Sequence, residues 1–233
     1  MARQLTFDLP VREALGREDF MVAPSNALAL RSVEGWRDWP GGKLVLVGPE
    51  GAGKTHLAHV WAQEAGARIV SAGALAGADI AALCATPHIA VEDADAIAGR
   101  VEAETALFHL HNHLLERGGR LLLSAKHPPQ RWPLVLPDLA SRMQAASCAT
   151  LEPPDDTLLA AVLVKLFADR QIAVPPRLVA YLVARMERSM AAARALVARL
   201  DAKALAQSRP LSRALAAEVL AEASMDSTGP GAA

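Results

Sequence analysis

The segment Gly48-Pro-Glu-Gly-Ala-Gly-Lys-Thr55 follows the apolar run 43–47 and opens a stretch of helical periodicity at 54–65. It matches the phosphate-binding pattern G-x-x-x-x-G-K-[ST] in full. Its glycines let the backbone turn sharply and present N–H groups to phosphate oxygens, and the next helix points its N-terminus at the same anion. The chemistry predicts a nucleotide loop whose binding residues are Gly48, Pro49, Glu50, Gly51, Ala52, Gly53, Lys54, Thr55 and His56, with Lys54 on the β- and γ-phosphates and Thr55 on Mg²⁺.

The sequence around this loop alternates between short apolar runs and helical patterns. The apolar runs are bounded by glycine, proline or polar residues and fall at 43–47, 68–71, 88–92, 120–124 and 148–151. Strands that alternate with helices in this way form parallel sheets covered on both faces. The pattern therefore predicts an α/β fold with a five-stranded parallel sheet.

The pattern changes after Glu152-Pro153-Pro154. Three or four helical patterns follow, at about 155–169, 176–186, 189–207 and 213–222, and no strand pattern interrupts them. We expect an extended arm at 1–18, a nucleotide-binding α/β domain at 19–153, a small all-helical lid domain at 154–223 and a disordered tail at 224–233.

Composition limits the classes of function. The 24 Lys and Arg residues nearly balance the 25 Asp and Glu residues, and the formal net charge of −1 argues against a broad basic face for nucleic acid. Cys84 and Cys148 are too few for a disulfide framework. No run reaches the ~18 apolar residues of a membrane span, and charges interrupt the first twenty residues. A cytoplasmic protein without a membrane anchor is expected.

A pair of acids ends the strand predicted at 88–92. We expect Glu92 to hold Mg²⁺, directly or through water, and Asp93 to orient the attacking water, because a P-loop enzyme needs a carboxylate for its metal on a neighbouring strand. Asp95 is a spare candidate. The alternative is a charged strand end with no catalytic work.

Three further features each leave two interpretations open. Lys126, just beyond the strand that ends at Ser124, is either a γ-phosphate sensor or a surface lysine. Arg142, in a short helix before the fifth strand, either reaches a neighbouring subunit's nucleotide or forms a surface salt bridge. The peptide Gln4–Leu9 either docks on a partner or folds its own apolar side chains onto the body.

These stretches together resemble the DnaA-like AAA+ ATPases over most of the chain. The similar segments are GAGKTHLAHV at 51–60, IAVEDADAIAG at 89–99, RLLLSAKHPP at 120–129 and LPDLASR at 136–142. The resemblance implies an AAA+ fold that holds ADP or ATP with Mg²⁺. It also implies an adenine pocket that includes Phe20, Met21, Val22 and Asn26.

The same resemblance assigns roles to two other parts of the chain. Arg142 falls on the arginine finger of the family. Residues 4–9 are similar to a hexapeptide that binds the DNA polymerase III sliding clamp (its beta subunit), which gives clamp contacts to Gln4, Leu5, Phe7 and Leu9.

The chain departs from the family at two sensor positions. Lys126 stands where the family has an aspartate, and Ala191 stands where it has an arginine. Arg194, three residues further on nearly the same helix face, is the best substitute and Arg188 is the other. These departures imply a weak ATPase.

The resemblance therefore implies a regulator of replication initiation. It would bind adenine nucleotide and the sliding clamp, contact DNA only through the clamp and stimulate hydrolysis of DnaA-bound ATP in trans, with homo-oligomerisation left open. One alternative is an autonomous AAA+ ATPase of the helicase-loader type, supported by the complete Gly53-Lys54-Thr55 and the acids at 92–93. Another is an adaptor that holds nucleotide only for structure.

Overall fold

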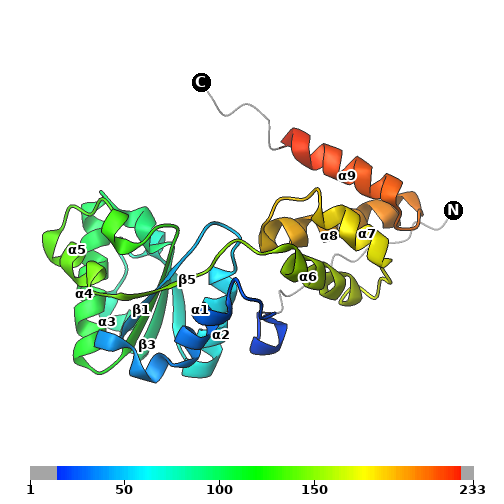
Figure 1. Ribbon diagram of the computed structural model, residues 1–233. Helices are drawn as coiled ribbons and strands as arrows, with labels where there is room; N and C mark the ends of the chain where they lie inside the picture. The colour runs from blue at the N-terminus through cyan, green and yellow to red at the C-terminus, as the bar shows by residue number, and fades with distance from the viewer. Residues whose placement is uncertain (1–14, 227–233) are drawn as a thin grey trace, which may run out of the picture.

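The computed structural model describes residues 15–226. The predicted clamp contacts Gln4, Leu5, Phe7 and Leu9 lie outside this range. The described chain has an α/β part and a helical part, which lie side by side in Figure 1.

The α/β part is built on five parallel strands in the order β2-β3-β4-β1-β5. The predicted fold class is confirmed. Inner strand β1 pairs with β4 on one side and β5 on the other, and it is buried along its whole length because apolar residues cover both of its faces. The strands span β1 Lys43–Val47, β2 Arg68–Ser71, β3 His88–Glu92, β4 Arg120–Ala125 and β5 Ser147–Thr150.

Helices cover both faces of the sheet. Side chains that alternate along each strand pack into two separate apolar cores, one on each face. On one face, α1 (Ala27–Glu34) and α2 (Lys54–Ala65) pack over Leu44 and Leu46. On the other, Val45 and Val47 pack beneath α3 (Ile80–Leu83), α4 (Val101–Glu116) and α5 (Pro137–Gln144). Figure 1 shows α4 and α5 on the side remote from the helical part.

The helical part has its own apolar core, which includes Phe167, Leu182 and Leu200. Its elements are α6 Asp156–Ala168, α7 Pro176–Val183, α8 Met190–Gln207 and α9 Arg213–Asp226. Side-chain oxygens of Asp155 and Ser189 cap the N-termini of α6 and α8. Within residues 15–226, no helix is both long enough and apolar enough to cross a bilayer.

The chain departs from the expected boundaries at both ends of the described range. Arg17–Asp19 is a 3₁₀ turn rather than extended arm, because Arg17 pairs with Glu34 at 3.0 Å and Gly16 O lies 3.1 Å from His56 Nε2. At the other end, α9 runs to Asp226, three residues into the predicted disordered tail. Each residue added to a formed helix gains a backbone hydrogen bond, which favours this extension.

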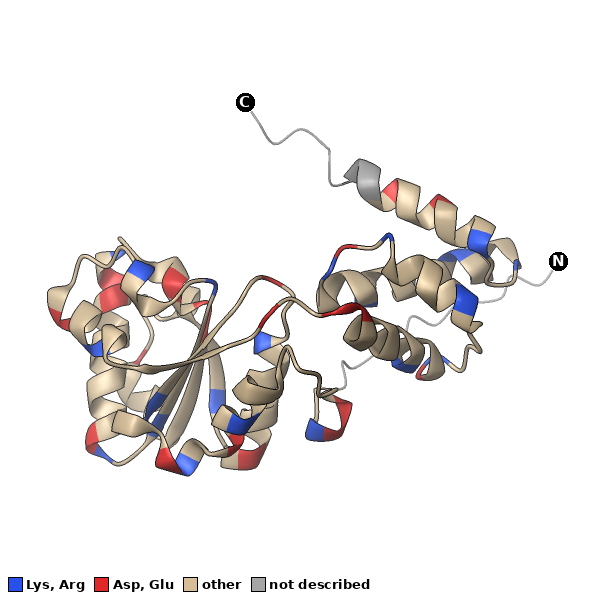
Figure 2. Ribbon diagram, viewed as in Figure 1, with Lys and Arg blue, Asp and Glu red and all other residues tan. Residues whose placement is uncertain are grey.

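Charged residues of both signs are interspersed over the described part of the chain, as Figure 2 shows. This distribution agrees with the net charge of −1. The affinity of a partner for this surface must therefore come from particular residues rather than from a single-sign field.

A buried carboxylate ties the loop before α5 to the rest of the fold. Glu104 on α4 is fully buried and accepts hydrogen bonds from the backbone N–H groups of Gly99, Val135 and Leu136, at 2.8 to 3.2 Å. A buried carboxylate requires such donors, because an unpaired one would carry a large desolvation cost. Glu104 thereby fixes where α5 begins.

Replacing Glu104 by glutamine is expected to lower the free energy of unfolding by about 3 kcal/mol, because the amide NH₂ would face N–H donors that lose their charged acceptor. Urea unfolding followed by tryptophan fluorescence measures this directly, since all four tryptophans lie in the α/β part. Glu102→Gln, at an exposed position of the same helix, is the control. Equal stability of the two variants would contradict the anchoring role.

Candidate nucleotide site

The loop between β1 and α2 adopts the conformation that its glycines allow. Gly51 and Gly53 have φ of +73° and +103°, in the region that side-chain-bearing residues rarely occupy. A Cβ at Gly51 would lie 2.4 Å from Ser189 Cβ, and Met190 N–H donates to Gly51 O at 2.9 Å. The loop is therefore held directly against the N-terminus of α8, which belongs to the helical part.

Lys54, the first residue of α2, turns back under this loop. Its side chain is only 7% exposed, and Nζ donates to Gly48 O at 2.7 Å and Pro49 O at 2.8 Å. Burial lowers the pKa of Lys54, and the nearby Asp93 and Asp95 oppose that shift. Around Lys54 is a cavity of about 630 Å³, whose lining includes the predicted residues Glu50, Gly51, Gly53, Thr55 and His56.

The sheet order brings the acids after β3 to the same cavity. Asp93 N–H donates to Ser124 Oγ at 3.1 Å on β4, the strand between β3 and β1. Asp93 and Asp95 both line the cavity beside Lys54.

Glu92, the predicted metal ligand, is not among the lining residues. It shares the sheet face of Ala90, which packs toward α2, because strand side chains alternate. Its Oε1 is buried and has no hydrogen-bond partner among the described residues. An orphaned carboxylate oxygen beneath the helix that starts with Lys54 and Thr55 fits a Mg²⁺ ion held through water.

Lys126 also lines the cavity around Lys54, and its side chain pairs with Glu50 of the loop. Its Nζ lies 2.9 Å from Glu50 Oε2, and this hydrogen bond raises the pKa of Lys126 and lowers that of Glu50. Asp95 Oδ2 accepts the backbone N–H groups of Lys126 and His127 at 2.9 and 3.2 Å. Asp95, the spare acid of the sequence interpretation, thus fixes the turn that carries Lys126.

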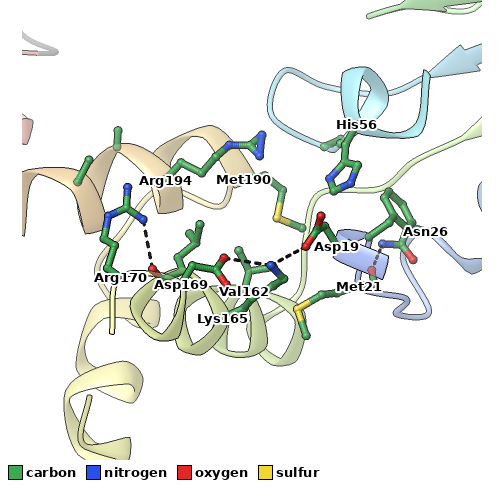
Figure 3. A pocket seen from close by; sticks show the side chains of 16 residues that line it. Asp19, Met21, Asn26, His56, Val162, Lys165, Asp169, Arg170, Met190 and Arg194 are labelled. Carbon is green, nitrogen blue, oxygen red and sulfur yellow. Dashed lines mark hydrogen bonds and ion pairs between the residues drawn. The ribbon is translucent and has the colours of Figure 1, made fainter. Parts of the chain in front are cut away.

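A second cavity, of about 610 Å³, lies between the loop and the helical part (Figure 3). Predicted residues that line it are Phe20, Met21, Asn26, Ala52 and His56. The Phe20 and His56 rings meet edge to face, with centroids 5.2 Å apart. Asn26 shapes the wall, because its side chain accepts from Ala23 N–H and donates to Met21 O, both at 2.9 Å.

Val22 does not belong to this wall. Its side chain is 54% exposed and is not among the residues that line either cavity. Val22 faces solvent, whereas the preceding residue, Met21, lines the cavity.

The helical part supplies the opposite wall, which the sequence interpretation missed. Lys165 Nζ on α6 lies 2.7 Å from Asp19 Oδ1 and 3.0 Å from Asp169 Oδ2, as Figure 3 shows. The hydrogen bond to Lys165 lowers the pKa of Asp19. Val162, Leu166 and Met190 add apolar surface. The only available signal was the amphipathic pattern of 155–169, which does not identify the facing partner.

Arg194 on α8 lines both cavities, whereas Ala191 lines only the cavity around Lys54. Figure 3 shows the Arg194 side chain extending from α8 toward the side of the cavity where His56 lies. Arg188, the other candidate, pairs with Asp156 at 2.8 Å and lines neither cavity. Of the two candidates for the second sensor, Arg194 therefore lines the cavities and Arg188 does not.

Arg142 lies apart from both cavities. On α5, its Nε donates to Asn112 Oδ1 at 2.9 Å, and its guanidinium carbon lies 4.8 Å from the centroid of the Phe108 ring. Among the described residues, neither Nη atom has a hydrogen-bond partner. No surface salt bridge to Arg142 occurs within residues 15–226, contrary to one of the two interpretations above.

Lowering the pH through 6.5 is expected to reduce the free energy of unfolding. Burial lowers the pKa values of His56, His88 and His111 from 6.5. The unfolded chain then binds more protons than the folded chain between 6.5 and the lowered values, so stability is full above that window and is lost as the pH falls through it.

Urea midpoints followed by tryptophan fluorescence at about pH 7.5 and about pH 5.5 test this expectation. His111→Gln should reduce the difference between the two midpoints, and His109→Gln, at an exposed position of the same helix, should not. A midpoint that is unchanged or higher at the lower pH would contradict it.

Comparison with known proteins finds related sequences among replication initiators. The chain is 27% identical over 227 residues to the chromosomal replication initiator protein DnaA of Thermomicrobium roseum, covering 88% of this chain and 49% of that protein. The DnaA protein of Zymomonas mobilis is 27% identical over 230 residues, covering 88% and 47%. The chain spans about half the length of these curated relatives. No protein-family model matches it.

Solved structures share the fold. Domain III of the Thermotoga maritima replication initiation protein DnaA superposes with a TM-score of 0.80 at 19% identity, covering 92% of this chain and 98% of that domain. AMPPCP-bound DnaA from Aquifex aeolicus gives a TM-score of 0.69 at 19% identity, covering 80% and 64%. The chain is therefore similar in sequence to DnaA proteins over most of its length, and it shares the fold of DnaA domain III.

Proposed function

We propose that this chain is a regulator of replication initiation of the Hda type. It binds an adenine nucleotide in its own two cavities and uses Arg142 to promote hydrolysis of ATP bound to DnaA. Residues 4–9 tether it to the sliding clamp, so it acts where DNA is being replicated. Its own turnover is slow, and its contribution to hydrolysis is made in trans.

The nucleotide part of the proposal is supported by two adjoining cavities with different chemistry. Glycine N–H groups, the N-terminus of α2 and Lys54 suit phosphates in one cavity. Phe20, Met21 and Leu166 give the other cavity an apolar lining that suits an adenine ring. Support also comes from the solved DnaA structure of similar fold, which is bound to AMPPCP.

Mg²⁺ fits the residues present. Thr55 Oγ1 and the orphaned carboxylate of Glu92 would hold the ion, and Asp93, which lines the cavity, would orient water. Bound there, the ion would neutralise charge on the phosphates. The chain's own residues supply the other cations, Lys54, Lys126 and Arg194.

The single observation that carries the in-trans role is the placement of Arg142. Through Asn112 and His111 it is linked to Lys43, the first residue of β1, whereas the phosphate loop follows the last residue of that strand. Five strand residues span about 16 Å. The two Nη groups of Arg142 have no partner among the described residues. In this proposal they contact a phosphate carried by another molecule, not the chain's own nucleotide.

The sensor positions support slow turnover. The Lys126 ammonium is already engaged by Glu50, and Ala191 offers no cation where the family has arginine. Arg194 reaches the cavity from one turn further along α8. The helical part, whose Met190 N–H donates to Gly51 O, holds nucleotide without the full set of groups that stabilise the transferring phosphoryl.

Reconstitution tests the proposal. DnaA loaded with labelled ATP is mixed with DNA-loaded sliding clamp and this chain in full length, and release of labelled phosphate is measured. Phosphate release that requires both the clamp and this chain is the expected result. Gln4→Ala and Phe7→Ala should each raise the concentration of chain that is needed, and clamp binding that ignores both changes would contradict the tether.

A helicase-loader type of ATPase is the second candidate, favoured by the cavity that joins Lys54, Thr55, Asp93 and Asp95. It predicts turnover of about 1 s⁻¹ or more by the isolated chain, in the range of ordinary enzymes. It also predicts single-stranded DNA binding that weakens steeply with salt. Slow turnover, with DnaA-dependent phosphate release, would exclude it.

A further inference from the structure

Two buried basic side chains meet at the start of β1. Lys43 and His111 are 7% and 6% exposed, and Lys43 Nζ lies 3.1 Å from His111 Nε2. Within residues 15–226, Lys43 forms no ion pair with a carboxylate. A buried ammonium without a carboxylate is costly, so its one polar contact has structural consequences.

The contact with Lys43 bears on the protonation state of His111. Burial and the nearby Arg142 lower the pKa of Lys43. While Lys43 is an ammonium it can only donate, so His111 Nε2 accepts from it, and the ring is neutral with its proton on Nδ1. Nδ1 then donates to Asn112 Oδ1 at 3.1 Å. The same oxygen accepts Arg142 Nε at 2.9 Å. The result is one continuous chain of hydrogen bonds from β1 through α4 to α5.

Two contacts constrain the guanidinium of Arg142. Asn112 holds Nε, and the Phe108 ring contacts the guanidinium at 4.8 Å. Both Nη groups remain without partners among the described residues. Part of the rotamer entropy of the Arg142 side chain is therefore lost on folding rather than when a partner arrives.

We propose that Lys43, His111 and Asn112 are positioning residues for Arg142. Their hydrogen bonds, called the relay below, hold Nε and orient the two Nη groups toward a phosphate on the partner protein. This inference rests on the proposed in-trans role of Arg142. The three residues touch no reacting atom, and they act through the orientation of one side chain.

Protonation of His111 would disrupt the relay. Protonation of His111 turns Nε2 into a donor facing Lys43, and Arg142 on α5 is the other charged group that faces the ring, so both neighbours are cations. Burial, followed by these cations, lowers the pKa of His111 against the opposing effect of Asn112. Stimulated hydrolysis should therefore be full at neutral pH and fall on acidification below 6.5.

The test compares full-length Asn112→Leu with Asn112→Asp and the control His113→Leu, whose residue on the same helix takes no part in the relay. In ¹⁵N-labelled protein, the Arg142 Nε–H resonance is assigned by its loss in Arg142→Lys. Asn112→Leu should abolish this resonance and lower the maximal stimulated rate about tenfold, with little change in the concentration for half-maximal stimulation. Asn112→Asp, which keeps an acceptor oxygen, should retain most of both, as should His113→Leu.

The outcomes separate the two proposals. If Arg142→Ala leaves phosphate release intact, the proposed function fails. If Arg142→Ala abolishes release while Asn112→Leu retains the resonance and the full rate, the positioning inference fails and the proposed function stands. A His111 ring that is protonated on Nε2 at neutral pH, seen in its ¹⁵N shifts, would also overturn the relay. Unchanged tryptophan fluorescence shows that each variant is folded.

Discussion

Replacing Arg142 by alanine is expected to lower the stimulated hydrolysis of DnaA-bound ATP about 10³-fold, because an arginine supplied in trans stabilises charge on the transferring phosphoryl by that order. The chain's own nucleotide affinity should stay unchanged, since Arg142 lines neither cavity. Single-turnover release of labelled phosphate from DnaA, with this chain in excess, measures the first effect. A thermal shift with ADP measures the second.

Two variants sharpen this experiment. Arg142→Lys keeps the charge but loses the planar fork and the Nε contact to Asn112, so we expect it to remain strongly impaired. Arg131→Ala, at an exposed position that lines neither cavity, is the matched control and should behave as the unmodified chain. Release that survives Arg142→Ala would remove the finger assignment, and so would an equal loss in Arg142→Ala and Arg131→Ala.

Replacing Lys54 by methionine is expected to weaken the binding of ADP and ATP about 100-fold, or about 3 kcal/mol. Methionine fills much of the same volume but removes the buried cation from the cavity that Lys54 lines with Asp93 and Lys126. Gly48 O and Pro49 O lose their Lys54 donor, but the Met190 hydrogen bond to Gly51 O does not involve Lys54 and should still hold the loop against α8. Isothermal titration with ADP measures the affinity.

The matched control for this change is Lys203→Met, which removes a lysine of α8 that pairs with Glu218 and lines neither cavity. Its ADP affinity should equal that of the unmodified chain. Equal affinities of Lys54→Met and Lys203→Met would show that nucleotide binds elsewhere, and the site proposed here would be wrong.

Local features of the sequence account for much of the candidate site. The glycine spacing in 48–55 specifies positive φ at Gly51 and Gly53, and a strand before the loop with a helix after it specifies a P-loop. The resemblance to DnaA-like proteins placed Phe20, Met21 and Asn26 at one cavity, as the structure does. It also included Val22, which is exposed and lines neither cavity, because a local segment does not reveal which of its side chains face the cavity.

The residues that the sequence interpretation missed act through long-range contacts. Lys165 meets Asp19 only because α6 packs beside the turn at Arg17–Asp19. Glu104 accepts N–H groups from a loop about thirty residues away, and Lys43 meets His111 across sixty-eight positions. Such pairs carry no periodic signal along the chain, so only the folded arrangement identifies them.

The sequence by itself determined the parallel α/β class, the phosphate loop and the helical part, because glycine conformation and hydrophobic periodicity act between near neighbours in the chain. The tertiary structure alone decided the strand order β2-β3-β4-β1-β5, which carries Asp93 and Asp95 to the cavity beside Lys54. It alone also placed Arg142 at the far end of the sheet and its Nε on Asn112. Packing sets these positions, since many sequences of strands and helices share one local pattern while a single arrangement buries their apolar faces together.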